Sequence, residues 1–89
     1  MFKVIVAGSR TFNDYGLLKE KLDYYLSNYN NVEIVSGTAK GADQYGERYA
    51  KERGFSIKKF PAQWDKYGKK AGYFRNKQMA EYADALVAF

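Results

Sequence analysis

The sequence predicts an α/β fold in which a four-stranded parallel sheet lies between two layers of helices. Three observations lead to this prediction. Short apolar runs, typical of buried strands, alternate with segments in which apolar residues recur at helical spacing. The connections between strands are of helical length, as right-handed crossovers between parallel strands require. The chain has 89 residues, so we expect one domain over residues 1–89.

The N-terminal part of the chain predicts a strand and a helix. Residues 3–7 are expected to form a short buried strand, which ends in the turn Gly8-Ser9-Arg10-Thr11. Residues 14–29 are expected to form the first helix, with Asn13 or Asp14 as its N-cap. The apolar residues at helical spacing on its inner face are Leu18, Leu22, Tyr25, Leu26 and Tyr29.

The middle of the chain repeats this pattern. Residues 32–36 are expected to form the second strand, and a second helix begins near Ala42 and is closed by Gly54. Gly46 lies inside that helix, where glycine costs about 1 kcal/mol relative to alanine. Close packing against the sheet would explain this glycine. The expected inner face comprises Ala42, Tyr45, Gly46, Tyr49, Ala50 and Arg53.

The C-terminal part predicts two further strands and one helix. Residues 55–60 alternate as a third strand, which Pro61 ends. A loop then runs to Lys70, a third helix spans about residues 71–83, and residues 85–89 form a fourth strand. We predict the strand order 3-2-1-4, a Rossmann-like three-layer arrangement with two helices on one face and one on the other. In this arrangement no helix covers part of the sheet, which we call the bare face.

Two turns rich in small residues project to one edge of the predicted sheet. Gly8-Ser9-Arg10 follows the first strand, and Ser36-Gly37-Thr38-Ala39-Lys40-Gly41-Ala42-Asp43 leads from the second strand into a helix. Unpaired N–H groups and the helix dipole favour an anion there, and we expect a phosphate. We expect the crevice between the first and fourth strands, where the winding reverses. Neither standard phosphate fingerprint is present, which disfavours ATP hydrolysis and ordinary dinucleotide binding.

Three charged side chains near these turns each have two interpretations. Arg10 could clamp a phosphate or carboxylate, or form a surface ion pair. Asp43 and Glu47 lie one helical turn apart and could bind ribose hydroxyls or polarise a water. The alternative is that Asp43 only complements the helix dipole and that Glu47 belongs to a solvated helix edge. The glycines of the second turn could likewise serve the turn alone.

A second candidate region leads into the third helix. Trp64 and Tyr67 could stack on a base, with Arg75 and Asn76 reaching the same ligand, or these aromatics could cover an edge of the core. Basic residues also concentrate here, either as an anion-facing patch or as a solvated surface. They are Lys66, Lys69, Lys70, Arg75 and Lys77.

The composition excludes several kinds of chemistry. The chain has no cysteine and no histidine, which removes thiolate nucleophiles, disulfides, thiolate zinc sites and imidazole catalysis. The net charge of +5 favours anionic partners. The N-terminal apolar run is too short for a signal peptide or a membrane span, so we expect a cytoplasmic protein without a membrane partner. No metal or cofactor is expected.

The whole set of motifs resembles the YspA-type, YpsA-related branch of the SLOG superfamily, whose relatives include the LOG nucleotide hydrolases and the DNA-processing protein DprA. The resemblance covers essentially the whole chain. The motifs that carry it are Gly8-Ser9-Arg10, Val35 to Asp43, Phe60-Pro61-Ala62-Gln63-Trp64, Tyr67-Gly68-Lys69, Ala71-Gly72, Arg75-Asn76 and Ala83 to Phe89.

This resemblance implies a Rossmann-like domain that senses or processes nucleotides or nucleotide-derived ligands. The residues that it implies for the pocket are Gly8, Ser9, Arg10, Ser36, Gly37, Thr38, Gly41 and Asp43, with Glu47, Arg75 and Asn76 at the rim. LOG enzymes have a longer glycine run in the second loop, so their activity does not transfer directly. Members of the branch usually continue past the fourth strand, and the chain lacks that extension. We therefore expect self-association or a partner across the bare face.

Three functions follow as hypotheses. The first is binding of a nucleotide-derived small molecule, with N-glycosidic hydrolysis by Asp43 and Glu47 if the protein is an enzyme. The second is single-stranded nucleic-acid binding, which the net charge of +5 and the basic cluster favour. The third is an interaction module that binds no ligand.

Overall fold

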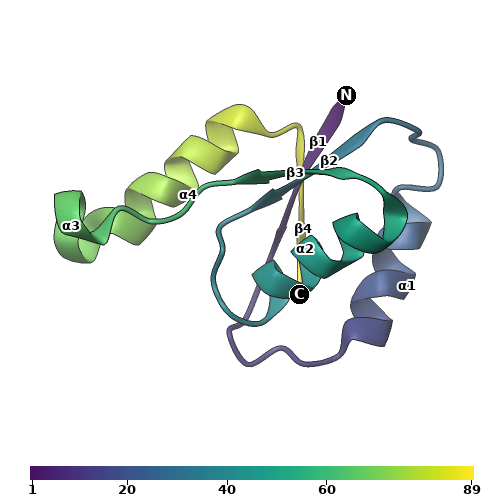
Figure 1. Cartoon of the computed structure of the whole chain (residues 1–89), viewed down its shortest axis with the longest axis horizontal. Coiled ribbons are helices and arrows are strands. Elements are labelled where there is room, and N and C mark those ends of the chain that lie inside the picture. The colour runs from purple at the N-terminus through teal and green to yellow at the C-terminus, as the bar shows by residue number, and fades with distance from the viewer.

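The computed structural model describes residues 1–89 and contains a four-stranded sheet with helices on both faces (Figure 1). The chain alternates between strand and helix, as expected from its hydrophobic pattern. In chain order the elements are β1 (Phe2–Ala7), α1 (Tyr15–Tyr25), β2 (Val32–Ser36), α2 (Ala42–Arg53), β3 (Ser56–Lys59), α3 (Trp64–Tyr67), the 3₁₀ turn η1 (Gly68–Lys70), α4 (Ala71–Tyr82) and β4 (Ala85–Ala88).

The sheet is parallel throughout and has the order β3-β2-β1-β4, which confirms the predicted fold class. β1 lies at the centre, where Val4 is in register with Ile34 of β2 and Ala85 of β4. The strand at the centre is buried on both faces and is therefore almost continuously apolar.

Two apolar clusters hold the three layers together. Val4, Val6 and Ile34 face α1 and α2, and pack with Leu18, Leu22 and Tyr49 among others. On the opposite face, Ile5 and Val35 pack against Met79 of α4. Two helices thus cover one face of the sheet and one covers the other, as predicted (Figure 1).

Helix α1 is shorter than its hydrophobic spacing predicts. Its N-cap is Asp14, whose side chain accepts a hydrogen bond from the Leu17 N–H at 3.0 Å, one of the two predicted caps. The helix ends at Tyr25 instead of residue 29. Tyr25 and Tyr29 are 53% and 43% exposed, so their expected place in the core is wrong. The chain turns after Leu26 and stacks the ring of Tyr29 on Phe2, with centroids 4.0 Å apart.

The two glycines of helix α2 have the roles expected of them. A Cβ at Gly46 would lie 2.8 Å from the Cβ of Val6, so this glycine allows the helix to approach β1 closely. Gly54 adopts a left-handed conformation with φ of 71° and donates its N–H to the last turn of the helix. Arg53, placed on the inner face by its spacing, instead pairs with Asp23 of α1 at 2.6 Å and is partly exposed.

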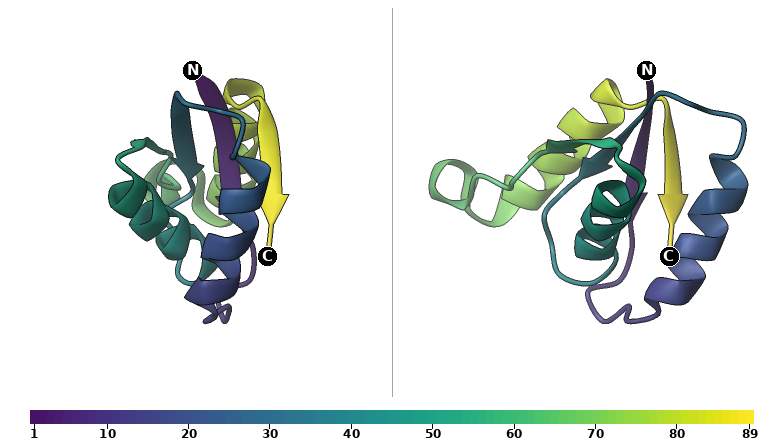
Figure 2. Two further views of the ribbon diagram at one scale, coloured as in Figure 1. Left: turned by 90° about the vertical axis from the view of Figure 1, so that its right-hand side faces the viewer. Right: turned by 45° about the vertical axis from the view of Figure 1, so that its right-hand side comes forward.

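The segment expected to be a loop before the third helix contains α3 and η1. Together with α4 it forms an arm that extends beyond the end of the sheet (Figure 2). The ring of Tyr67 packs on Phe74 of α4, with centroids 4.5 Å apart, and this contact holds α3 against the first turn of α4. No helix of the structure is long and apolar enough to cross a bilayer.

Candidate functional site

The loops that follow β1, β2 and β3 meet at the carboxyl edge of the sheet, next to α4. A buried serine is the base of the second loop. Ser36 is fully buried, and its hydroxyl donates to Glu47 Oε2 at 2.6 Å and accepts from the Thr38 N–H at 3.0 Å. The other carboxylate oxygen of Glu47 lies 3.6 Å from the Lys59 ammonium. Ser36 and Glu47 therefore tie the loop to α2 and β3.

Asp43 supports the same loop from the first turn of α2. Its Oδ2 accepts from the Ala39 N–H at 3.2 Å, and the residue is only 6% exposed. Burial raises the pKa of Asp43, although the Ala39 N–H and the Arg75 charge oppose this increase. Thr38 is held at φ of 64°, a left-handed conformation that β-branched residues rarely adopt. Such strain persists where the surroundings determine the conformation.

The first loop covers part of the N-terminus of α2. The Ser9 carbonyl accepts from the Ala42 N–H at 3.3 Å. A Cβ at Gly41 would lie 2.3 Å from this carbonyl oxygen and 2.7 Å from that of Arg10, so only glycine fits there. The predicted anion site at this helix N-terminus is thus partly occupied by the backbone of the first loop.

Arg75 reaches the second loop from α4. Its Nη1 donates to the Gly37 carbonyl, and its Nε donates to Asn76 Oδ1 at 2.7 Å. A Cβ at Gly37 would lie 2.8 Å from both Arg75 Nη1 and Asp43 Oδ2. The absence of a side chain at Gly37 therefore lets an arginine and a carboxylate approach the loop from opposite elements.

A small hollow of about 90 Å³ opens between these loops and α3. Two guanidinium groups and one indole ring are among the groups that form its wall, and Trp64 is 54% exposed. The residues that line the hollow are Arg10, Gly37, Thr38, Ala39, Ala62, Trp64 and Arg75.

The hollow lies beside the ends of β2 and β3, not in the crevice expected between the first and fourth strands. The backbone of Phe89 fills that crevice. Ser9 donates its N–H to the Phe89 carbonyl at 3.3 Å, and a Cβ at Gly8 would lie 2.2 Å from the same oxygen. Gly8 therefore permits close packing between the first loop and the end of β4.

The structure distributes the predicted site residues over three places. Four of them share the hollow, namely Arg10, Gly37, Thr38 and Arg75. Ser36, Asp43 and Glu47 lie beneath the loop, where their polar atoms hold its backbone. Gly8, Ser9 and Gly41 form the contacts between loops, and Asn76 holds Arg75.

Sequence reasoning assigned no role to Ala39 and Ala62, although both line the hollow. The only sequence feature that could have identified these two alanines is their position, because each follows the carboxyl end of a strand at this edge of the sheet. Small side chains at these points leave the hollow open.

We expect the raised pKa of Asp43 to make stability depend on pH. The folded state favours the protonated carboxyl of Asp43, so this group adds to the free energy of unfolding at pH values below its ordinary pKa of 3.8. The added stability is lost as the pH rises through the raised pKa. Asp43→Asn keeps an acceptor for the Ala39 N–H and removes the buried charge. Urea unfolding between about pH 4 and 8 should therefore show wild type losing stability relative to Asp43→Asn. A constant difference, as in an exposed Glu20→Gln control, would contradict this.

Comparison with known proteins identifies the family. A model of the YspA, cpYpsA-related SLOG family matches residues 2–67. The chain belongs to this family. The matched residues contain the loops that follow β1 and β2 and also Trp64, and they end before Arg75. Membership in the SLOG family supports a nucleotide-related binding or processing role in general.

A viral protein is also similar to this SLOG chain. The Gene 61 protein of Mycobacterium phage D29 is 35% identical over 97 residues, an alignment that covers 100% of this chain and 77% of the phage protein. No solved structure matches.

Proposed function

We propose that the protein binds a nucleotide-derived ligand at the hollow, with a phosphate between Arg10 and Arg75 and a base against Trp64. The observation that carries this proposal is the presence of two guanidinium groups and an exposed indole around one hollow at the carboxyl edge of a parallel sheet. Guanidinium groups bind phosphate in planar, charge-assisted geometry, and indole rings stack on bases.

The size of the hollow limits which part of the ligand enters it. At about 90 Å³ it is much smaller than the roughly 300–1,000 Å³ typical of pockets that enclose a whole small molecule. A single phosphoryl group is a suitable occupant, and the rest of the ligand then lies over the exposed face of Trp64. A nucleoside monophosphate has this shape.

Binding is better supported than hydrolysis. The two carboxylates considered for catalysis are engaged beneath the loop, where Asp43 accepts from Ala39 and Glu47 accepts from Ser36. Neither residue lines the hollow. Cleavage of an N-glycosidic bond stays a prediction, which chromatography of nucleoside monophosphate incubations tests by comparing free base from wild type and from Asp43→Ala/Glu47→Ala.

The test of the proposed function is calorimetric titration with a nucleoside 5′-monophosphate, the matching nucleoside and inorganic phosphate. We expect the monophosphate to bind, the nucleoside to fail, and phosphate alone to bind more weakly. Arg10→Ala should lower the affinity about tenfold or more, since it removes a charge-assisted hydrogen bond. Arg48→Ala is the matched control, because Arg48 lies on α2 and is paired with Glu52.

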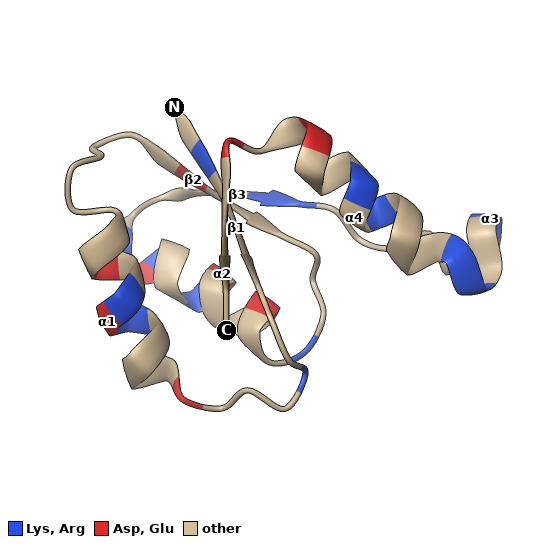
Figure 3. Cartoon of the chain, turned by 180° about the vertical axis from the view of Figure 1, so that it is seen from behind, with Lys and Arg blue, Asp and Glu red and all other residues tan.

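One observation favours a second candidate. The arm formed by α3, η1 and α4 is rich in lysine and arginine (Figure 3), and Trp64 and Tyr73 on it are 54% and 68% exposed. Exposed aromatics among basic residues suit single-stranded nucleic acid. Titration with a short oligonucleotide separates the two functions. Steeply salt-dependent oligonucleotide binding without monophosphate binding would favour the second and contradict the first.

A further inference from the structure

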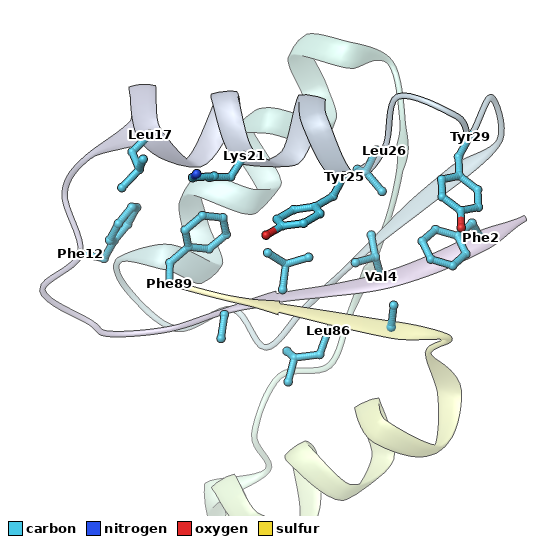
Figure 4. A pocket seen from close by; sticks show the side chains of 13 residues that line it. Phe2, Val4, Phe12, Leu17, Lys21, Tyr25, Leu26, Tyr29, Leu86 and Phe89 are labelled. Carbon is cyan, nitrogen blue, oxygen red and sulfur yellow. The ribbon is translucent and has the colours of Figure 1, made fainter.

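A second surface lies between α1 and β4, and unlike the polar hollow it is apolar. It is a groove of about 700 Å³, and twelve of its thirteen lining residues are hydrophobic. Figure 4 shows side chains of α1 above the groove and β4 below it, with Phe12 and Phe89 at one end and Phe2 and Tyr29 at the other. Several of its hydrophobic side chains are exposed, including Leu17 at 39% and Tyr25 at 53%.

The groove borders an open edge of the sheet. β3 and β4 are the two edge strands, and they differ in how strongly their residues oppose pairing with a strand of another chain. β3 contains Lys58 and Lys59, which discourage the addition of another strand. β4 is Ala85-Leu86-Val87-Ala88 and has no charged residue. An uncharged edge beside an apolar groove is typical of a strand that pairs with another chain.

We propose that β4 pairs with β4 of a second copy in antiparallel orientation, so that two sheets join into one across a two-fold axis at Val87. In this register Val87 faces its own copy, Ala85 faces Phe89, and Leu86 faces Ala88. Each unequal pair combines a large side chain with a small one, which suits close cross-strand packing. Residues 85–89, which are β4 and the residue after it, are thus self-complementary around Val87, and this is why we favour a second copy over a different partner.

The same symmetry covers the groove. A two-fold axis perpendicular to the joined sheet leaves α1 of both copies on one face. The exposed flank of α1, with Leu17 and Tyr25, then faces the equivalent flank across β4 and its copy. Lys21 is the one charged residue of the groove, and its aliphatic stem can cover apolar surface while its ammonium stays in water. Thirteen groove residues are fewer than the about 20–30 of a standard interface side, so this interface belongs to the small class that weak and transient complexes form.

Sedimentation equilibrium and a single cysteine test this pairing. The chain has no native cysteine, so Val87→Cys introduces a unique thiol. Cα atoms opposite each other in antiparallel strands are about 4.5–5.5 Å apart, within the range that a disulfide spans. We expect wild type to dimerise at micromolar concentration and Val87→Cys to form a covalent dimer on oxidation. Tyr73→Cys, a more exposed position on α4, is the control and should not cross-link.

Leu86→Lys provides the second test. Leu86 is 60% exposed, so lysine is tolerated in the monomer, but it places charge at the paired edge. We expect Leu86→Lys to raise the dissociation constant of the dimer at least about tenfold and Tyr73→Lys to leave it unchanged. Circular dichroism verifies that both variants fold. A wild type that is monomeric at about 300 μM would overturn the proposal. So would a folded Leu86→Lys variant that dimerises as well as wild type. Both outcomes are independent of nucleotide binding.

Discussion

Gly41→Ala is expected to destabilise the protein by about 3 kcal/mol or more, a large part of the stability of a small domain. Gly41 adopts φ of 78° and ψ of −127°, a region that residues with a side chain avoid. The new Cβ would also lie 2.3 Å from the Ser9 carbonyl oxygen. Relief of this contact requires the backbone of the first loop to move, because no flexible side chain can give way. The measurement is urea unfolding followed by circular dichroism.

Gly54→Ala is the matched control for Gly41→Ala. Gly54 has a similar φ of 71°, but a Cβ there meets nothing within 4 Å. Gly54→Ala should therefore lower the free energy of unfolding only because alanine disfavours the left-handed conformation, by about 1 kcal/mol. The two glycines differ in ψ, −127° at Gly41 and 24° at Gly54, so the difference between the two variants measures the contact between the first loop and α2 together with the stricter backbone conformation of Gly41. Equal losses of stability would contradict this prediction, because they would show that neither the contact nor the special conformation of Gly41 adds to the cost of the left-handed φ.

The elements that local patterns determine could be predicted from the sequence. The parallel sheet followed from the alternation of apolar runs with helical periodicity, because parallel strands need crossover helices, and the order 3-2-1-4 predicted for a Rossmann-like sheet is confirmed. Gly54 and Asp14 act through backbone groups within a few residues of themselves, so their roles as helix caps were visible in the sequence. Gly46 was predictable for a related reason, since glycine inside a helix needs a close neighbour.

Features that depend on contacts between distant segments could not be predicted in the same way. Periodicity continued α1 to Tyr29, but the stack of Tyr29 on Phe2 of β1 requires the chain to leave the helix earlier. The position of the hollow depends on Phe89, which packs on Gly8 and fills the expected crevice. The contact of Arg75 with the Gly37 carbonyl joins residues 38 positions apart. No spacing rule describes such contacts.

The same distinction between local patterns and contacts of distant segments applies to the residues of the candidate site. Sequence motifs predict that Ser36 and Asp43 belong to a phosphate-type loop. They do not say whether the polar atoms face a ligand or hold the loop. In the structure both side chains accept hydrogen bonds from loop N–H groups, which then have no capacity for an anion. The cationic groups that line the hollow come instead from Arg10 and Arg75, which approach it from other elements.

Arg75→Ala is expected to lower the affinity for a nucleoside monophosphate about tenfold to a hundredfold, because hydrogen bonds to charged groups contribute roughly 1.5–3 kcal/mol. The same change removes the donor to the Gly37 carbonyl and should reduce stability as well. Calorimetry measures the affinity, and urea unfolding verifies that the variant is folded at the temperature of the titration. Lys77→Ala, an exposed cation two residues further along α4, is the control for net charge.

Arg75→Lys separates the charge of Arg75 from its geometry. Lysine retains a positive charge at the hollow but lacks the planar group that can bind the Gly37 carbonyl and a phosphate together. We therefore expect Arg75→Lys to recover part of the affinity that alanine loses and little of the stability. If Arg75→Lys restored affinity fully, the hollow would use Arg75 only as a charge. If Lys77→Ala weakened binding as much as Arg75→Ala, the attraction would come from the basic arm as a whole, and the hollow would not be the ligand site.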